Sequence, residues 1–200
     1  GLYDVIIAAL IKSCELMVKD CKSSKTMIKN HEEKIRTHLL ENYLESSEAR
    51  NVIGLADIPV RFLAEVSENY DKDSDMYIGR TDIRVMSSNW LANKEDYYTI
   101  ECKRIDGTLL LNQKYIDDGV CRFTGNHPKY SSYNNKNIMF GFVVKNIDCT
   151  VMINNISDIH IAEVNSCELP DAKVVFDKEF TFKMDKIGQP ELPNAGVTFG

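Results

Sequence analysis

Two stretches of the chain decide its fold, YIGRTDIRVM at residues 77–86 and DYYTIECKRI at residues 96–105. Apolar and polar residues alternate in both, which is the pattern of a β-strand with one buried face. Successive strand side chains point to opposite faces, so Glu101 and Lys103 emerge side by side. If the two strands pair, Asp82 lies next to Glu101. The sequence therefore predicts that two carboxylates and a lysine meet on one face of a sheet.

A Glu-x-Lys triplet alone is a weak signal, because one arises by chance about once in a chain of this length. Glu32-Glu33-Lys34 lies in a helical pattern, where residues two apart do not share a face. Pro170-Asp171-Ala172-Lys173 leads out of a loop, and no acidic strand precedes it. Only Glu101-Cys102-Lys103 follows another strand that carries an acid on its polar face.

Composition favours a single domain spanning residues 1–200, with 44% hydrophobic residues. The six cysteines form no CxxC pair, which is typical of reduced thiols rather than of a disulfide framework. With neither a signal peptide nor an 18-residue apolar run, we expect a soluble cytoplasmic protein without a membrane segment. The net charge of −6 counts mildly against nucleic-acid binding, although carboxylates gathered around metal ions would offset part of this objection.

Two helices are expected before the first strand. Residues 4–21 form an amphipathic pattern, and a second helix is predicted from about residue 25 to 44, with Ser23-Ser24 as its cap. Glu32 falls on the apolar stripe of this second helix, which is unusual for an acid without a partner. A boundary residue that reaches solvent is the alternative interpretation, and Glu33 is the neighbouring candidate.

The remaining elements follow from the same periodicities. We expect strands at 60–69 and 138–144, helices at 111–123 and 148–156, and a hairpin formed by 173–177 and 179–184. Glu65, on the first strand, is a reserve candidate for the acidic site. The polar loop at residues 125–137 could contact phosphates or stack on bases through Lys129, Tyr130 and Tyr133, or be only a connection.

The order helix, three strands, helix and strand, with Asp82 on the second strand and Glu101-Cys102-Lys103 on the third, resembles the PD-(D/E)XK nuclease superfamily. Thr81 stands where the name of the motif has proline. The resemblance covers about residues 25–144. It implies an α/β fold with a restriction-endonuclease-like core at 25–145, a central mixed β-sheet flanked by helices (αβββαβ). An extra N-terminal helix (1–22) and a C-terminal extension with a hairpin (146–200) would complete the chain.

The resemblance also implies a metal-dependent mechanism. Asp82, Glu101 and the main-chain carbonyl of Cys102 would hold Mg²⁺, for which Mn²⁺ would substitute. Glu32 would hold a second ion or water around the first. Lys103 would orient or help to deprotonate the attacking water. Two residues of the following helix, Gln113 and Lys114, resemble positions that help to bind substrate in some members.

Three functions remain open at this point. The first is a Mg²⁺-dependent phosphodiesterase, a nuclease whose expected substrate is DNA, with RNA still open, in restriction, phage defence, mobile-element biology or repair. Cleavage of both strands needs two active sites, so a homodimer or partner subunits would fit. The second is a non-catalytic binding or assembly protein with a degenerate nuclease-like fold. The third is an unrelated α/β protein in which Asp82, Glu101 and Lys103 form a structural salt-bridge set.

Overall fold

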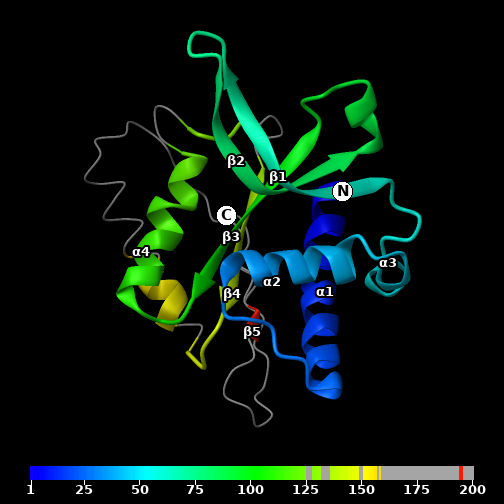
Figure 1. Cartoon of the computed structure of the whole chain (residues 1–200), viewed down its shortest axis with the longest axis vertical. Helices are drawn as coiled ribbons and strands as arrows, with labels where there is room; N and C mark the ends of the chain where they lie inside the picture. The colour runs from blue at the N-terminus through cyan, green and yellow to red at the C-terminus, as the bar shows by residue number, and fades with distance from the viewer. Residues whose placement is uncertain (125–127, 132–135, 149–150, 157, 159–193, 196–200) are drawn as a thin grey trace.

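The computed structural model describes residues 1–124, 128–131, 136–148, 151–156, 158 and 194–195. Four main strands form a mixed sheet in the order β1 (Val60–Asp71), β2 (Met76–Ser87), β3 (Tyr97–Ile105) and β4 (Asn137–Val143). β1, β2 and β3 are antiparallel neighbours, β4 runs parallel to β3, and the two-residue β5 (Asn194–Ala195) pairs with β4. The fold is thus α/β with a mixed sheet and helices (Figure 1).

The helices precede the sheet and connect its last strands. Their bounds are α1 (Leu2–Ser24), α2 (Glu32–Leu39), the π-helical turn η1 (Leu40–Leu44), α3 (Ser47–Ile53), α4 (Leu109–Asp117) and the 3-10 turns η2 (Ser88–Leu91) and η3 (Val120–Arg122). Residues 151–156 are also helical, and Asp148 Oδ1 accepts a hydrogen bond of 3.3 Å from the amide of Val151. Among the described residues, no helix is long and apolar enough to cross a membrane.

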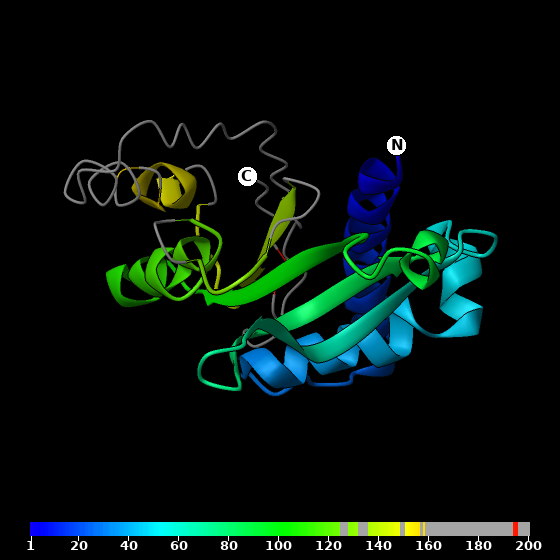
Figure 2. The same cartoon turned by 90° about the horizontal axis from the view of Figure 1, so that it is seen from above.

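Helices cover both faces of the sheet. The larger core joins α1, α2, η1 and α3 to one face, through side chains such as Ile83, Ile100 and Phe140. A smaller cluster on the other face joins α4 and residues 151–156 to β3 and β4, around Ile105 and Met139. Figure 2 shows α2 below the strands and α4 beside the end of β3. The N-terminal helix α1 therefore shares one core with α2, α3 and the sheet.

The helix boundaries differ from those predicted. α1 continues through Ser23-Ser24 and ends where Lys25 adopts a left-handed φ of 56°. The predicted cap is therefore wrong, and the second helix begins at Glu32 rather than near residue 25. The third predicted helix stops at Asp117, short of Gly119, and continues only as η3. The predicted hairpin at 173–184 lies outside the described residues.

The pairing between strands β2 and β3 ends about halfway along their length. They are paired only from Ile83↔Ile100 to Met86↔Tyr97, whereas β2 stays paired with β1 as far as Met76. The β1–β2 hairpin therefore extends away from β3 (Figure 1). Asp82 is the first β2 residue past the paired segment, and the neighbouring position on β3 is Glu101. The opening between the strands thus begins at the two predicted carboxylates.

Candidate active site

A pocket of about 570 Å³ lies where β2 and β3 diverge. Its charged lining consists of three carboxylates and five cationic side chains, a balance of +2 in a chain whose net charge is −6. These residues are Glu32, Asp82, Glu101, Arg36, Arg80, Lys103, Arg122 and Lys129. The pocket therefore favours an anionic ligand despite the acidic composition of the whole chain.

Lys103 lies at the centre of the predicted residues. Its Nζ donates to Glu101 Oε1 at 2.6 Å and to the carbonyl of Cys102 at 2.9 Å. The same nitrogen is 3.6 Å from Glu32 Oε1 and 4.0 Å from Asp82 Oδ2. The structure thus brings together all the residues predicted for catalysis and metal binding. Cys102 itself points into the core, as expected, and its thiol is fully buried.

Asp82 is tied to both neighbouring elements. Its Oδ2 accepts a 2.7 Å hydrogen bond from the amide of Cys102, which joins β2 to β3 beyond their last pair. Its Oδ1 accepts from Arg36 of α2, and Arg36 also donates to Glu65 Oε1 at 2.6 Å. Glu65, the reserve candidate, does not line the pocket and reaches the site through Arg36 and through Arg80, which lies 3.3 Å from its Oε2. Charge-assisted bonds of this kind hold the Asp82 carboxylate in one orientation.

Glu101 is almost completely buried, with 1% of its side chain exposed. Tyr130 donates to its Oε2 at 2.8 Å, and Arg122 lies 3.3 Å from its Oε1. Burial and the nearby negative charge of Asp82 raise the pKa of Glu101 to about 7, because the attraction of Lys103 and Arg122 offsets these effects only in part. This carboxyl group can therefore exchange a proton near neutral pH.

The pKa of Lys103 moves in the direction that keeps its ammonium charged. Burial lowers this pKa, but the carboxylates of Glu101, Glu32 and Asp82 outweigh burial and raise it. Lys103 is therefore a hydrogen-bond donor and a positive charge at neutral pH. A neutral Lys103 that removes a proton from water is not favoured by these surroundings.

Glu32 is the first residue of α2, where an acid interacts favourably with the helix dipole. Its Oε2 accepts a 2.9 Å hydrogen bond from the amide of Arg104, and its Oε1 faces Lys103. Glu33 is exposed and does not line the pocket. Between the two neighbouring candidates, the geometry selects Glu32.

The residues predicted to bind substrate fall into two groups. Lys129 lines the pocket, whereas Gln113 and Lys114, on α4, do not. Gln113 donates instead to Asp117 on its own helix, at 3.0 Å. Tyr130 is 1% exposed and its hydroxyl bonds to Glu101, so the expectation that a base stacks on its ring is wrong. Tyr133 lies outside the described residues.

Three arginines of the pocket, Arg36, Arg80 and Arg122, were not predicted as site residues. Arg36 lies four residues after Glu32, on the same face of α2, and this spacing was a usable signal. Arg122 follows α4 in η3 and donates to the hydroxyl of Tyr130. No sequence pattern marks Arg122, because its position depends on where α4 ends.

The donor chemistry of the pocket fits a divalent cation. Carboxylate oxygens of Glu32, Asp82 and Glu101 and the carbonyl of Cys102 all surround one point, the Nζ of Lys103, so these oxygens already enclose a positive charge. Mg²⁺ prefers such hard oxygen ligands. Within the described ranges, however, no three acidic, histidine or cysteine side chains lie close enough to hold one ion as they stand. For a cation to occupy this point, the Nζ of Lys103 would have to leave its contacts with Glu101 and the Cys102 carbonyl.

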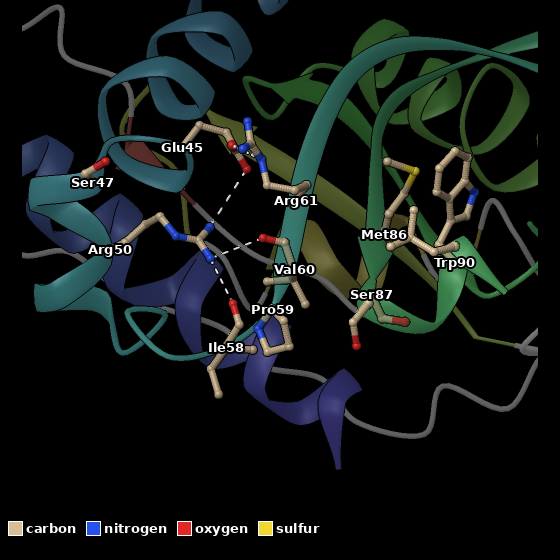
Figure 3. A pocket seen from close by; sticks show the side chains of 12 residues that line it. Glu45, Ser47, Arg50, Ile58, Pro59, Val60, Arg61, Met86, Ser87 and Trp90 are labelled. Atoms are coloured by element: carbon tan, nitrogen blue, oxygen red, sulfur yellow. Dashed lines mark hydrogen bonds and ion pairs between the residues drawn. The ribbon is translucent and has the colours of Figure 1, made fainter. Parts of the chain in front are cut away.

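A second pocket, of about 550 Å³, lies at the other end of β1 and β2 (Figure 3). Its central cation, Arg50, donates to the carbonyls of Ile58 and Val60, and its acid, Glu45, pairs with Arg61 at 2.7 Å. These contacts fasten α3 and η1 to the start of β1. The charged groups here serve the fold, so this pocket is the weaker candidate for chemistry.

Comparisons of the chain with models of protein families, with curated proteins and with solved structures give no match. The pocket between β2 and β3 is therefore the feature of this protein that indicates a function.

Proposed function

We propose that the protein is a metal-dependent nuclease of restriction-endonuclease-like fold, which hydrolyses phosphodiester bonds with DNA as its expected substrate. One observation carries the proposal. Glu32, Asp82, Glu101 and Lys103 come from three elements, α2, β2 and β3, and converge in a single pocket. The excess of cationic side chains in that pocket supports a phosphate-bearing substrate.

The residues have separate tasks in this proposal. Asp82, Glu101, Glu32 and the Cys102 carbonyl would hold Mg²⁺ or Mn²⁺, which supplies an activated water and neutralises charge on the phosphate. Lys103, kept charged by its neighbours, stabilises the negative charge that develops on the phosphate oxygens. Arg122 and Lys129 lie at the same pocket and attract the phosphodiester. Glu101, whose pKa is raised to about 7 without metal, would have to be in its carboxylate form to hold the cation.

A non-catalytic binding protein is the second candidate, and a specific observation favours it. Each of the three carboxylates already has a cationic or amide partner: Lys103 and Arg122 for Glu101, Arg36 for Asp82, and the Arg104 amide for Glu32. Such a set can persist as an ion-pair cluster that binds an anion without cleaving it. Metal-dependent cleavage separates the two candidates.

The test is incubation of the protein with plasmid DNA, linear DNA and RNA, with Mg²⁺, Mn²⁺ or EDTA. Lys103→Ala should lower the cleavage rate about 10²- to 10⁴-fold, because it removes a charge that acts in the transition state. Lys19→Ala, an exposed lysine on α1 outside the pocket, is the matched control and should cleave like wild type. Equal rates for the two variants would refute the site assignment.

Metal binding can be measured apart from cleavage. A ligand that binds only the folded state at ten times its Kd stabilises it by about 1.4 kcal/mol, or roughly 3–6 °C in melting temperature. Mn²⁺ should produce this shift in wild type and not in Asp82→Asn. Absence of both a shift and cleavage, with or without DNA present, would favour the binding protein.

A further inference from the structure

The outer part of the β1–β2 hairpin carries large exposed apolar side chains. Tyr70 and Tyr77 are 49% and 58% exposed and share one face of the hairpin, and we refer to these two residues as the hairpin patch. Met76 and Ile78, which flank Tyr77 on β2, are also exposed but belong to the opposite face. Tyr70 and Tyr77 are cross-strand partners whose ring centroids lie 5.3 Å apart. The hairpin projects beyond the rest of the sheet (Figure 1), so the patch lies on an outer arm of the molecule. Exposed aromatic residues gathered at one place are typical of a binding surface.

The hairpin patch is continuous with the candidate active site. Tyr77 belongs to the patch and also lines the pocket, whose lining continues along β2 through Ile78, Gly79 and Arg80. Tyr77 lies three residues from Arg80, about 10 Å along the strand. A flexible ligand whose anionic group occupies the pocket would therefore pass over Tyr77.

The charges along the hairpin indicate how such a ligand lies. The pocket end is cationic, through Arg80, Lys129 and their neighbours. The turn at the far end carries Asp71, Asp73 and Asp75 against one cation, Lys72, so it is net negative. Phosphates are attracted to the first region and repelled by the second. A nucleic-acid strand fits this arrangement if its backbone stays at the pocket and its uncharged bases lie against the patch.

We propose that the hairpin patch is a stacking platform for the unpaired bases of a single-stranded nucleic acid whose phosphate occupies the pocket. The inference rests on the proposed nuclease function and specifies its substrate class. Base faces are accessible in a single strand, whereas stacking within a duplex covers them, so aromatic side chains next to a cationic groove favour single strands. Single-stranded ends, loops or flaps next to the scissile bond are the substrates expected from this geometry.

The test measures binding in EDTA, where cleavage does not occur. Fluorescence anisotropy of labelled oligonucleotides about 15 nucleotides long would compare single-stranded DNA, single-stranded RNA and a blunt DNA duplex. We expect wild type to prefer a single strand, and Tyr77→Ala to weaken that binding by about 5- to 100-fold. Tyr77→Phe keeps the ring and should bind like wild type. Leu109→Ala, an exposed apolar residue on α4 that is absent from the pocket lining, is the matched control.

The possible results separate this inference from the proposed function. Cleavage by wild type in Mg²⁺, together with unchanged single-strand binding by Tyr77→Ala, overturns the stacking platform alone. Tyr77-dependent binding without cleavage by wild type supports the platform and removes the nuclease activity. A wild-type dimer that Tyr77→Ala converts to a monomer, with DNA binding unchanged, overturns the inference in favour of a docking surface for a second copy. Comparison of the DNA and RNA arms identifies which strand the platform accepts.

Discussion

The loss of the Asp82 side chain provides a sharp test of the structure, because two arguments predict opposite signs. Two carboxylates side by side with one lysine suggest repulsion, so that removing Asp82 should stabilise the protein. The structure shows instead that Asp82 accepts hydrogen bonds from Arg36 and from the Cys102 amide. We therefore expect Asp82→Ala to destabilise the fold while it also abolishes cleavage.

The magnitude follows from the two lost contacts. The Cys102 amide is a buried donor that would lose its acceptor, at a cost of about 1–3 kcal/mol. Arg36 would keep Glu65 but lose its more buried partner, a further cost of about 1 kcal/mol. Removal of the repulsion between Asp82 and Glu101 acts in the opposite direction and stabilises the variant by about 1 kcal/mol. The sum is a destabilisation of about 2 kcal/mol, or roughly 4–8 °C in melting temperature.

Urea unfolding followed by circular dichroism, in EDTA at pH 7.5, measures this free energy directly. Asp118→Ala, an exposed acid at the end of α4, is the matched control and should be within about 0.5 kcal/mol of wild type. Asp82→Asn can still accept from the Cys102 amide, so it should lie between wild type and Asp82→Ala. A variant Asp82→Ala that is as stable as wild type, or more stable, would show that repulsion dominates and would refute the reasoning.

Three further predictions follow from the same geometry. Glu101→Gln mimics the protonated acid. Since the folded-state pKa of Glu101 is raised from 4.5 to about 7, ionisation should cost the wild type nothing below about pH 4.5 and about 3 kcal/mol above about pH 7. In urea unfolding, Glu101→Gln should therefore be more stable than wild type at pH 8 and about equally stable at pH 4.5. A gain in the free energy of unfolding that is the same at both pH values would contradict the assignment. Glu32→Gln should lower the cleavage rate more than Glu33→Gln in parallel assays, because only Glu32 faces Lys103, and the reverse ranking would move the assignment to Glu33. Gly79→Ala should lower both the cleavage rate and the melting temperature, because the added Cβ would lie 2.7 Å from the Lys129 carbonyl oxygen and 2.9 Å from the Tyr130 ring. An unchanged rate and melting temperature would mean that the segment with Lys129 and Tyr130 can move away without cost.

The sheet and its central pair of acids could be predicted because strand periodicity is a strong local signal. Alternation located β1, β2 and β3 within a few residues, and an antiparallel pairing across a short loop is enough to place Asp82 next to Glu101. The face carrying Glu101 and Lys103 was expected to be polar, yet the structure buries both residues. Periodicity identifies which residues share a face, but the neighbouring elements decide whether that face is covered.

The helix ends and the partners of the carboxylates could not be predicted in this way. α1 passes through Ser23-Ser24 because nothing in that segment stops a helix, and the left-handed residue that ends it is a lysine rather than a glycine. Arg122 and Tyr130 reach Glu101 from segments that follow β3, across tertiary contacts that no short spacing encodes. The sequence therefore located the acids and Lys103 but not most of the groups that set their protonation.

The energetics of the cluster argue against a purely structural role. Glu101 and Lys103 are buried, and the pKa of Glu101 is raised although two cations lie within 3.3 Å of it. Its ionised form therefore lowers the stability of the fold at neutral pH, and burying charges together is often no better for stability than packing apolar side chains there. If the ion pairs served only stability, an acid with a raised pKa would not be expected next to a second acid. Here both acids line a pocket whose charged side chains are mostly positive. Perturbed acids in such a pocket are typical of functional sites, because the same proximity that destabilises the free protein favours a bound cation and a phosphate.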